Sequence, residues 1–192
     1  MTNPLTNILD MAKQLLTTNI KPTGIYADFT MGNGNDTLYI KKTCPHAKIY
    51  AFDIQQTAID NTRKKLENKG LLDSNIQLIL DSHENFANHI SENIDGAIFN
   101  LGYLPGGNKE ITTKAESTLR CLKSALNRLN PGGVIVVALY PGHPAGAIEA
   151  EAIVNFSEKI DSAKFLSLLY KFTNTKNSPF ILAFQKRTKT QP

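Results

Sequence analysis

Acidic and polar side chains follow three consecutive apolar runs of this sequence, at the point where each run ends. They are Asp28, Asp53 and the pair Ser82 and His83. If the runs are parallel strands, these side chains meet at one edge of a sheet, where such sheets bind ligands. A carboxylate in the position of Asp53, about 20 residues beyond a glycine loop, can accept hydrogen bonds from both hydroxyls of a ribose. His83 alone could equally be an N-terminal helix residue.

A glycine-rich loop lies between the first run and the helix expected after it. It contains Gly32, Asn33, Gly34 and Asn35, and it departs from the GxGxxG pattern because the third glycine is missing. Asp28 precedes it, and a carboxylate there would not favour a pyrophosphate. S-adenosylmethionine carries an amino group and a sulfonium instead, so Asp28 suits this cofactor, directly or through water. The alternative is a plain tight turn.

The loop after the fourth apolar run points to methyl transfer onto nitrogen. Its residues Asn100-Leu101-Gly102-Tyr103 resemble the NPPY loop of amino-methyltransferases, with Leu101-Gly102 in place of the two prolines. In that loop an asparagine carbonyl accepts a hydrogen bond from the amine, and the aromatic ring stacks on a planar base. We therefore expect Asn100 and Tyr103 to bind the substrate. Alternatively, the loop only shapes the surface and Tyr103 covers the core.

Periodicity predicts alternating strands and helices along the chain. The expected strands are 25–29, 48–53, 75–80, 95–99, 134–140, 164–172 and 179–186. The expected helices are 5–20, 36–43, 55–69, 82–91, 115–129 (stopped by 130–133) and 147–160. Such alternation requires crossover connections, so we predict an α/β fold: a mostly parallel sheet with helices on both faces and a final hairpin that can add an antiparallel strand.

Length and composition set the remaining bounds. With 192 residues, of which 41% are hydrophobic and 20% charged, we expect one globular domain over 1–192, with an N-terminal helix within 1–22 and a basic tail at 186–192. The longest apolar stretch is far too short to span a membrane, and the polar start predicts a cytoplasmic protein. Cys44 and Cys121 lie far apart, so we expect no metal site and no disulfide framework.

Five segments together resemble one family over nearly the whole chain, the bacterial transfer-RNA 5-(aminomethyl)-2-thiouridine methyltransferases, formerly labelled ribosomal-RNA methylases. The segments are DFTMGNGNDT, YAFDIQ, DSHEN, FNLGYLPGGNKEITT and YPGHPAGAIE. The resemblance implies a Rossmann-like class I methyltransferase with a seven-stranded sheet. It also implies N-methylation of the aminomethyl group on the wobble uridine of tRNA, giving 5-methylaminomethyl-2-thiouridine. Phe29 and Asn35 depart from the alanine and histidine usual in the family.

The resemblance also assigns residues and partners. It places cofactor contacts at Asn33, Asn35, Asp53, Gln55, Ser82 and His83. The implied partner is a tRNA anticodon loop, which a net charge of +4 favours weakly. Candidate RNA contacts are Lys41-Lys42, Arg63-Lys64-Lys65, Lys109, Lys114 and Lys186-Arg187-Thr188-Lys189, although such runs are more often solvated helix faces or tails. A homodimer is plausible.

His143 follows the fifth strand and completes the expected substrate-side set with Asn100 and Tyr103. Its imidazole titrates near neutral pH and could take the proton that the amine must lose, or it could merely satisfy a loop carbonyl. The sequence identifies no certain base. The alternative functions are a ribosomal-RNA or small-molecule methyltransferase, a non-catalytic S-adenosylmethionine-binding module and a dehydrogenase.

Overall fold

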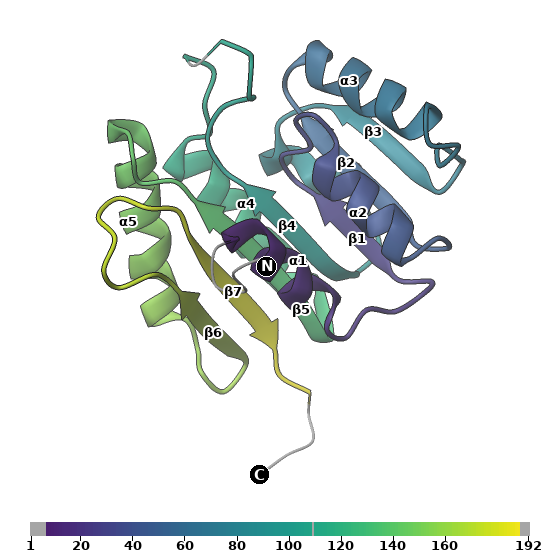
Figure 1. Ribbon diagram of the computed structural model, residues 1–192. Helices are drawn as coiled ribbons and strands as arrows, with labels where there is room; N and C mark the ends of the chain where they lie inside the picture. Colours follow the sequence, from purple (N-terminus) through teal and green to yellow (C-terminus); the bar gives the residue numbers. More distant parts are fainter. Residues whose placement is uncertain (1–6, 109, 189–192) are drawn as a thin grey trace, which may run out of the picture.

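A mostly parallel sheet runs through the middle of the computed structural model (Figure 1), which describes residues 7–108 and 110–188. These residues form seven strands in the order β3-β2-β1-β4-β5-β7-β6. The strands are β1 (Ile25–Asp28), β2 (Lys48–Asp53), β3 (Ile76–Leu80), β4 (Ile94–Asn100), β5 (Leu129–Leu139), β6 (Phe165–Tyr170) and β7 (Phe180–Lys186). The first five pair in parallel, and β7 lies antiparallel between β5 and β6. The predicted fold class is confirmed.

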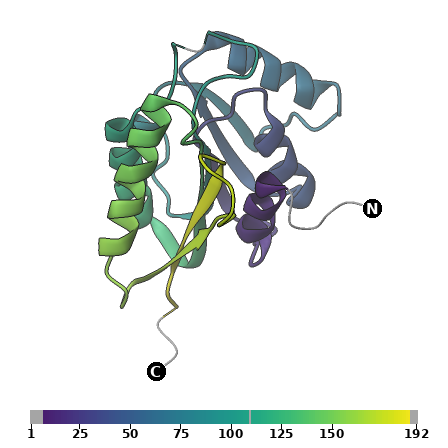
Figure 2. The same ribbon diagram turned by 60° about the vertical axis from the view of Figure 1, so that its left-hand side comes forward.

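Helices cover both faces of this sheet, with α4 and α5 on one side and α1 and α2 on the other (Figure 2). They are α1 (Ile8–Thr17), α2 (Asn35–Thr43), α3 (Gln56–Glu67), the short 3₁₀ helix η1 (His83–Asn88), α4 (Ala115–Asn127) and α5 (Pro144–Lys159). Successive side chains of a strand point to opposite faces of the sheet and so join different hydrophobic cores. Tyr26 packs with α1 and α2, whereas Ala27 packs with α4 and α5. Within the described ranges, no helix is long and apolar enough to cross a membrane.

The segment 130–133 is part of a strand, and the prediction that it forms a turn after α4 is wrong. The helix ends at Asn127, and β5 begins already at Leu129. Asn130 donates from Nδ2 to Asp95 of β4 at 2.9 Å, which ties the segment to the sheet. The pairing of β4 with β5 shifts register between Ile94 and Gly96, which pair with Leu129 and Val134, and the residues of β5 between these two partners form an irregularity. Gly132 lies in this irregularity and adopts φ +80°. Pairing with β4 therefore overrides the local turn signal.

Two further elements differ from their predicted extent. The helix expected over 82–91 is only η1, because Asp81 accepts hydrogen bonds from Asn85 Nδ2 and His89 Nε2 and so holds the segment in a tight turn. The first helix begins at Ile8, with Asn7 as its N-cap. Residues 5 and 6 of the predicted helix lie outside the described part of the chain.

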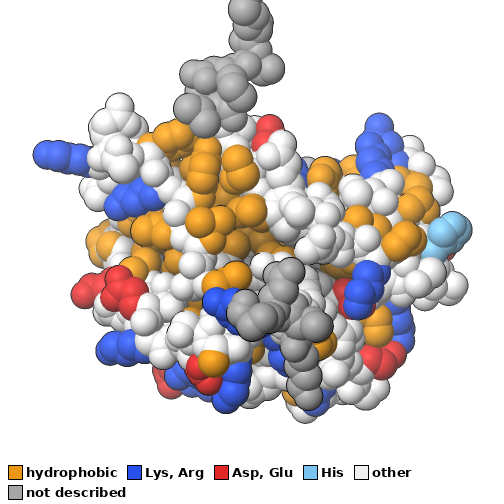
Figure 3. Space-filling view, turned by 90° about the horizontal axis from the view of Figure 1, so that it is seen from below, with side chains coloured by type: hydrophobic (Ala, Val, Ile, Leu, Met, Phe, Trp, Pro, Cys, Tyr) orange, Lys and Arg blue, Asp and Glu red, His pale blue; other side chains and the backbone are white. Residues whose placement is uncertain are grey.

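Strand β6 forms one edge of the sheet and is largely solvent-exposed. Leu166, Leu168 and Leu169 are each about half exposed, with values of 46%, 49% and 50%. Seen from below, the largest group of hydrophobic side chains lies left of the centre and smaller groups lie on the right, whereas lysine and arginine side chains lie mostly around the outline (Figure 3). The apolar sequence of this strand therefore does not signify burial, which is a limit of periodicity as a guide at a sheet edge.

Candidate active site at the carboxyl edge of the sheet

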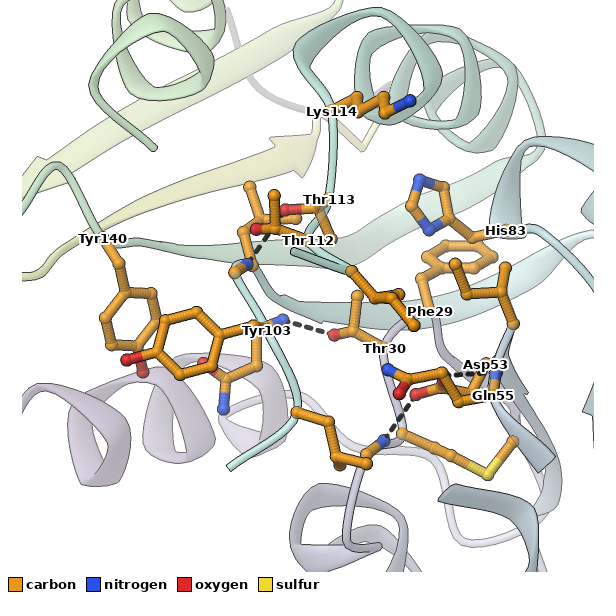
Figure 4. Close-up of a pocket in the computed structure, with 18 of the residues that line it drawn as sticks. Phe29, Thr30, Asp53, Gln55, His83, Tyr103, Thr112, Thr113, Lys114 and Tyr140 are labelled. Carbon is orange, nitrogen blue, oxygen red and sulfur yellow. Dashed lines mark hydrogen bonds between the residues drawn. The ribbon is translucent and has the colours of Figure 1, made fainter. Parts of the chain in front are cut away.

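A cavity of about 1200 Å³ opens at the carboxyl ends of β1, β2 and β4. Ten of the twelve predicted site residues line it: Gly32, Asn33, Asn35, Asp53, Gln55, Ser82, His83, Asn100, Tyr103 and His143. Figure 4 shows two halves. His83, Phe29, Asp53 and Gln55 lie in one half, and the rings of Tyr103 and Tyr140 lie close together in the other. Asp28 and Gly34 do not belong to the cavity wall.

Asp28 is buried beneath the glycine loop and binds residues on both sides of it, Thr30 before the glycines and Thr37 in α2. Its side chain is completely buried and accepts hydrogen bonds from Thr37 Oγ1 at 2.6 Å and from the Thr30 main-chain N–H at 3.2 Å. Burial and the neighbouring Asp36 carboxylate raise the pKa of Asp28 to about 7. The sequence predicts Asp28 as a cofactor contact, whereas its carboxylate oxygens are directed at the loop itself.

The glycine loop needs glycine at two positions because its backbone is left-handed there. Gly32 has φ +48° and Gly34 has φ +72°. Gly34 also packs directly against α3, where an added Cβ would lie 2.8 Å from Thr62 Cγ2 and 3.0 Å from its Cα. Thr62 in turn donates from Oγ1 to the Gly32 carbonyl at 3.1 Å. The second glycine thus sets how closely the loop approaches α3.

Gly34→Ala should therefore lower the free energy of unfolding by about 3 kcal/mol, through a left-handed backbone penalty of about 1–2 kcal/mol and an overlap with Thr62. Gly70→Ala is the matched control, since Gly70 has φ +63° and no heavy atom within 4 Å of an added Cβ. The free energy of unfolding of this control should fall only by the left-handed backbone penalty of about 1–2 kcal/mol. Denaturant unfolding of both variants measures the difference, and equal losses would mean that the Thr62 contact does not matter.

Asp53 joins the end of β2 to the glycine loop. Its Oδ2 accepts the Gly32 main-chain N–H at 3.0 Å, and its Oδ1 accepts that of Gln55 at 3.0 Å. Burial raises the pKa of this carboxyl, although hydrogen bonds from the Gln55 and Gly32 main chain act in the opposite direction. Each oxygen keeps a lone pair for a hydroxyl of a bound ribose. Ile54 beside it lines the cavity and is 58% exposed, so it offers an apolar surface to a base.

His83 is the first residue of η1 and is nearly buried at 8% exposure. Its ring meets Phe99 edge-on with ring centroids 5.7 Å apart, and it makes a hydrogen bond to the main chain of Phe29. Its Nε2 is buried without a partner. Burial lowers the pKa of this imidazole to about 4. A neutral imidazole with an unsatisfied nitrogen in the wall of the cavity fits a ligand with a polar edge.

The lowered pKa of His83 should make stability depend on pH. Between pH 6.5 and 4 the unfolded chain protonates His83 whereas the folded protein does not. The free energy of unfolding is therefore unaffected by this titration above pH 6.5 and falls by about 3 kcal/mol as the pH is lowered to 4. His83→Gln removes this titration. The difference in unfolding free energy between the protein and this variant should therefore shift by that amount between pH 7 and pH 4 in denaturant titrations. A difference that stays constant with pH would show that the imidazole titrates normally.

Asn100 ends β4 and enters the substrate half of the cavity. Its main-chain N–H donates to Thr30 Oγ1 at 2.6 Å, and its Nδ2 faces Asp36 Oδ2 at 3.5 Å. This orientation leaves Oδ1 as the acceptor of the carboxamide that is available to a substrate. The main chain of Asn100 is therefore fixed by a short hydrogen bond, whereas its carboxamide has only the long contact with Asp36.

The loop after Asn100 is anchored to α5 through a chain of hydrogen bonds. The Gly102 main-chain N–H donates to Thr113 Oγ1 at 2.9 Å, and Thr113 donates to Glu149 Oε2 at 2.7 Å. Glu149 is 2% exposed and also accepts from Thr118 at 2.6 Å. Burial raises the pKa of Glu149, although the hydrogen bonds from the Thr118 and Thr113 hydroxyls act to lower it. Tyr103 follows this anchor, pairs with Thr112 in a β-bridge and is 41% exposed at the cavity.

His143 is the N-cap of α5. Its Nδ1 accepts the Gly146 main-chain N–H at 3.1 Å, and its Nε2 is buried without a partner. Because Nδ1 accepts a hydrogen bond, the proton of the neutral ring lies on Nε2. The ring centroid is 6.2 Å from that of Tyr103, so the predicted substrate-side residues do lie together. However, the unpaired Nε2 of His143 is a hydrogen-bond donor, so it does not suit the expected role of accepting the proton of the amine.

Sequence reasoning missed several residues of the cavity. They are Thr30, Asp36, Ile54, Thr112, Thr113 and Tyr140. Thr112 and Thr113 lie after the asparagine loop in a segment without periodicity, and the available signal was that they belong to a segment resembling the family. Asp36 and Tyr140 also lie in such segments, close to predicted site residues.

The predicted basic clusters divide between structure and surface. Lys41 is buried and binds Asp73 at 2.6 Å and the Pro45 carbonyl at 2.5 Å, so its prediction as an RNA contact is wrong. Lys65 donates to Asn35 Oδ1 at 2.5 Å and so supports the glycine loop. Lys114 lines the cavity itself. Lys109 and Lys189 lie outside the described residues.

Together these features define a class I methyltransferase: a mostly parallel sheet with β7 antiparallel, a glycine loop after β1, a carboxylate after β2 and an asparagine loop after β4. Residues 49–186 match the family model described as "Putative rRNA methylase", and the chain belongs to this family. This confirms the family that the sequence motifs resemble.

Three relatives illustrate the family. A chloroplastic "tRNA (mnm(5)s(2)U34)-methyltransferase" of Arabidopsis thaliana is 35% identical over 83% of this chain, which spans 62% of the plant protein's length. A Clostridium thermocellum crystal structure, described as a "putative rRNA-methylase", is 34% identical with a TM-score of 0.91, covering 94% of this chain and 98% of that one. A Streptococcus mutans "putative methyltransferase", solved in complex with SAH, is 35% identical with a TM-score of 0.85 and the same coverage.

Proposed function

We propose that this methyltransferase acts on tRNA and methylates the 5-aminomethyl group of 5-aminomethyl-2-thiouridine at the wobble position, giving 5-methylaminomethyl-2-thiouridine. The cofactor is S-adenosylmethionine, as in its family. The name of the Arabidopsis protein supports the choice of substrate. The observation that carries the proposal is Asn100, which is held at the carboxyl end of β4 with one amide oxygen available, close to Tyr103 at the same cavity.

The chemistry of the cavity fits S-adenosylmethionine. Asp53 offers carboxylate lone pairs for the ribose, Ile54 offers an apolar surface for the adenine, and His83 has an unsatisfied Nε2 in the same half. The glycine loop brings main-chain atoms close to the ligand. When bound, the cofactor supplies an electrophilic methyl group on a positively charged sulfur.

The protein's contribution is mainly positioning. Asn100 Oδ1 accepts a hydrogen bond from the substrate amine and so directs the nitrogen lone pair. The exposed Tyr103 ring stacks on the planar base that carries the amine. Thr112 Oγ1 and His143 Nε2 are buried polar atoms without partners on this side, and both can donate to carbonyl groups of the base. Lys114 places a positive charge beside the cavity for the RNA backbone.

The anticodon loop suits a cavity of this kind because its bases are single-stranded and can be turned out of the stack. Tyr103, which is 41% exposed at the cavity, is the aromatic side chain on which the wobble base would stack. The family description favours a second candidate, a ribosomal-RNA methyltransferase, which would use the same cofactor and the same amine-directed loop.

The test is mass spectrometry of nucleosides after incubation of the protein with S-adenosylmethionine and tRNA that carries 5-aminomethyl-2-thiouridine. We expect that nucleoside to gain one methyl group. Ribosomal RNA, incubated in parallel, should remain unmethylated. Methylation of the ribosomal RNA alone would support the second candidate. Cofactor binding without transfer to either RNA would indicate a small-molecule methyltransferase or a non-catalytic module.

A further inference from the structure

Asp36 is a nearly buried carboxylate in the wall of the cavity, and the positioning roles above do not use it. It lies in the first turn of α2, is 7% exposed and borders both the large cavity and a smaller groove beside it. Its oxygens lie 3.7 Å from Lys13 Nζ and 3.5 Å from Asn100 Nδ2. Both distances are long for a carboxylate so deeply buried. Asp36 can therefore accept a shorter hydrogen bond from a group that enters the cavity.

The substrate amine brings a proton that it must lose before it can attack a methyl group. A primary alkylammonium such as that of lysine has a pKa of about 10.4, so the lone pair of this nitrogen is occupied at neutral pH. The acceptor of the proton has to lie within hydrogen-bond reach of the nitrogen, or one water molecule away. Asp36 faces Nδ2 of the carboxamide whose Oδ1 would bind the nitrogen, so its carboxylate lies beside the expected position of the amine.

Within the described residues, three other polar groups near Asn100 are less suited to accept the proton. His143 already accepts through Nδ1, so its unpaired Nε2 carries a hydrogen. Burial raises the pKa of Tyr140 to about 12, so this residue stays a neutral phenol. Asp28 is completely buried beneath the glycine loop and does not line the cavity. Asp36 is the carboxylate that both lines the cavity and contacts Asn100.

We propose that Asp36 binds the substrate ammonium and accepts its proton, an assignment that rests on the proposed function. One N–H bond of the ammonium breaks, its electron pair stays on nitrogen, and the proton moves to a carboxylate oxygen of Asp36. The amine and the carboxylic acid that result are both neutral. Asn100 then holds the amine for attack, and Asp36 returns the proton to water once the methylated product has left.

The charges around Asp36 are consistent with this role. Lys13 faces it from α1, Lys65 from α3, Asp28 from β1 and Tyr140 from the loop after β5. Burial raises the pKa of Asp36, while Lys13 and Asn100 act to lower it. Burial also lowers the pKa of an ammonium that enters the cavity. The two pKa values therefore approach one another, which makes the transfer less unfavourable than in water.

The test compares Asp36→Asn with the unaltered protein in the tRNA methylation assay from pH 6.5 to 9.5. At pH 7 the variant should be slower by about 10²–10³-fold, as for loss of a general base. The deficit should shrink as pH rises, because more of the free amine is then neutral before it binds. Asp60→Asn is the matched control, since Asp60 is an exposed carboxylate on α3 that bonds Gln56 and lies outside the cavity. It makes the same change in net charge.

Binding gives a second readout. The unaltered protein should bind tRNA with the aminomethyl group more tightly than the same tRNA without it, and Asp36→Asn should lose this preference while its affinity for SAH in calorimetry stays the same. A deficit that is constant with pH, or a retained preference, would overturn the role of Asp36. If the amide variant does not fold, Asp36→Ser replaces it with the same expectations. An unaltered protein that methylates no such tRNA would overturn the proposed function, and this role with it.

Discussion

Replacing Asn100 by alanine should lower kcat/KM for methyl transfer by about 10²–10³-fold, which corresponds to about 3–4 kcal/mol of transition-state stabilisation. The variant removes the oxygen that directs the amine and also the Nδ2 contact with Asp36. The main-chain hydrogen bond to Thr30 does not depend on the side chain, so the loop itself should keep its place. Steady-state kinetics with tRNA that carries 5-aminomethyl-2-thiouridine measures the effect.

Asn108→Ala provides the matched control, because Asn108 is an exposed amide in the same loop that bonds Glu110 and does not line the cavity. It should keep kcat/KM within about threefold, the range usual for surface substitutions. The affinity of Asn100→Ala for S-adenosylmethionine, measured by calorimetry, should also be unchanged. If turnover persists in Asn100→Ala, or if its cofactor affinity falls in parallel, the residue does not act on the substrate side.

The carboxyl edge of the sheet was predictable because two local signals determine it. Apolar runs such as 48–53 reveal buried strands, and the residue types directly after them reveal which ends bind a ligand. Asp53 follows from these signals, Asn100 follows from them together with the resemblance of its loop to NPPY, and both line the cavity. Neither inference required knowledge of how the side chains pack.

Contacts between distant segments explain what the sequence did not reveal. The carboxylate of Asp28 is directed at Thr37, and the hydroxyl of Thr113 meets Glu149, 36 residues away. Lys41 is drawn into the interior by Asp73 across 32 residues. Segment 130–133 extends a strand because β4 lies beside it. In each case a tertiary partner decides between alternatives that local propensity leaves open.

The Glu149 contacts connect the segment after the asparagine loop to α5. Gly102 follows Asn100 at φ +114°, and its N–H is held through Thr113 by a carboxylate on α5. Thr113, Thr118 and Glu149 therefore hold in place the main chain between Asn100 and Tyr103. None of these three residues contacts the reacting atoms in the proposed reaction.

Asp53→Ala should raise the dissociation constant of S-adenosylmethionine by about 10²–10³-fold, or about 3–4 kcal/mol. Two losses combine, since hydrogen bonds to a charged group contribute about 1.5–3 kcal/mol each. The ribose loses its carboxylate partner, and the Gly32 and Gln55 main-chain N–H groups lose the acceptor that fixes the glycine loop. Isothermal titration calorimetry with S-adenosylmethionine and with SAH measures both affinities.

The matched control for this substitution is Asp60→Ala, which removes an exposed carboxylate of α3 that accepts a hydrogen bond from Gln56 Nε2. It should leave both affinities within about threefold, as surface changes usually do. Asp53→Asn separates the two losses, because an amide keeps one acceptor oxygen but turns an N–H toward the other main-chain donor. Its affinity should fall between those of the unaltered protein and Asp53→Ala. An Asp53→Ala protein that binds the cofactor as well as its control would show that the carboxylate only braces the loop and that the nucleoside lies elsewhere in the cavity.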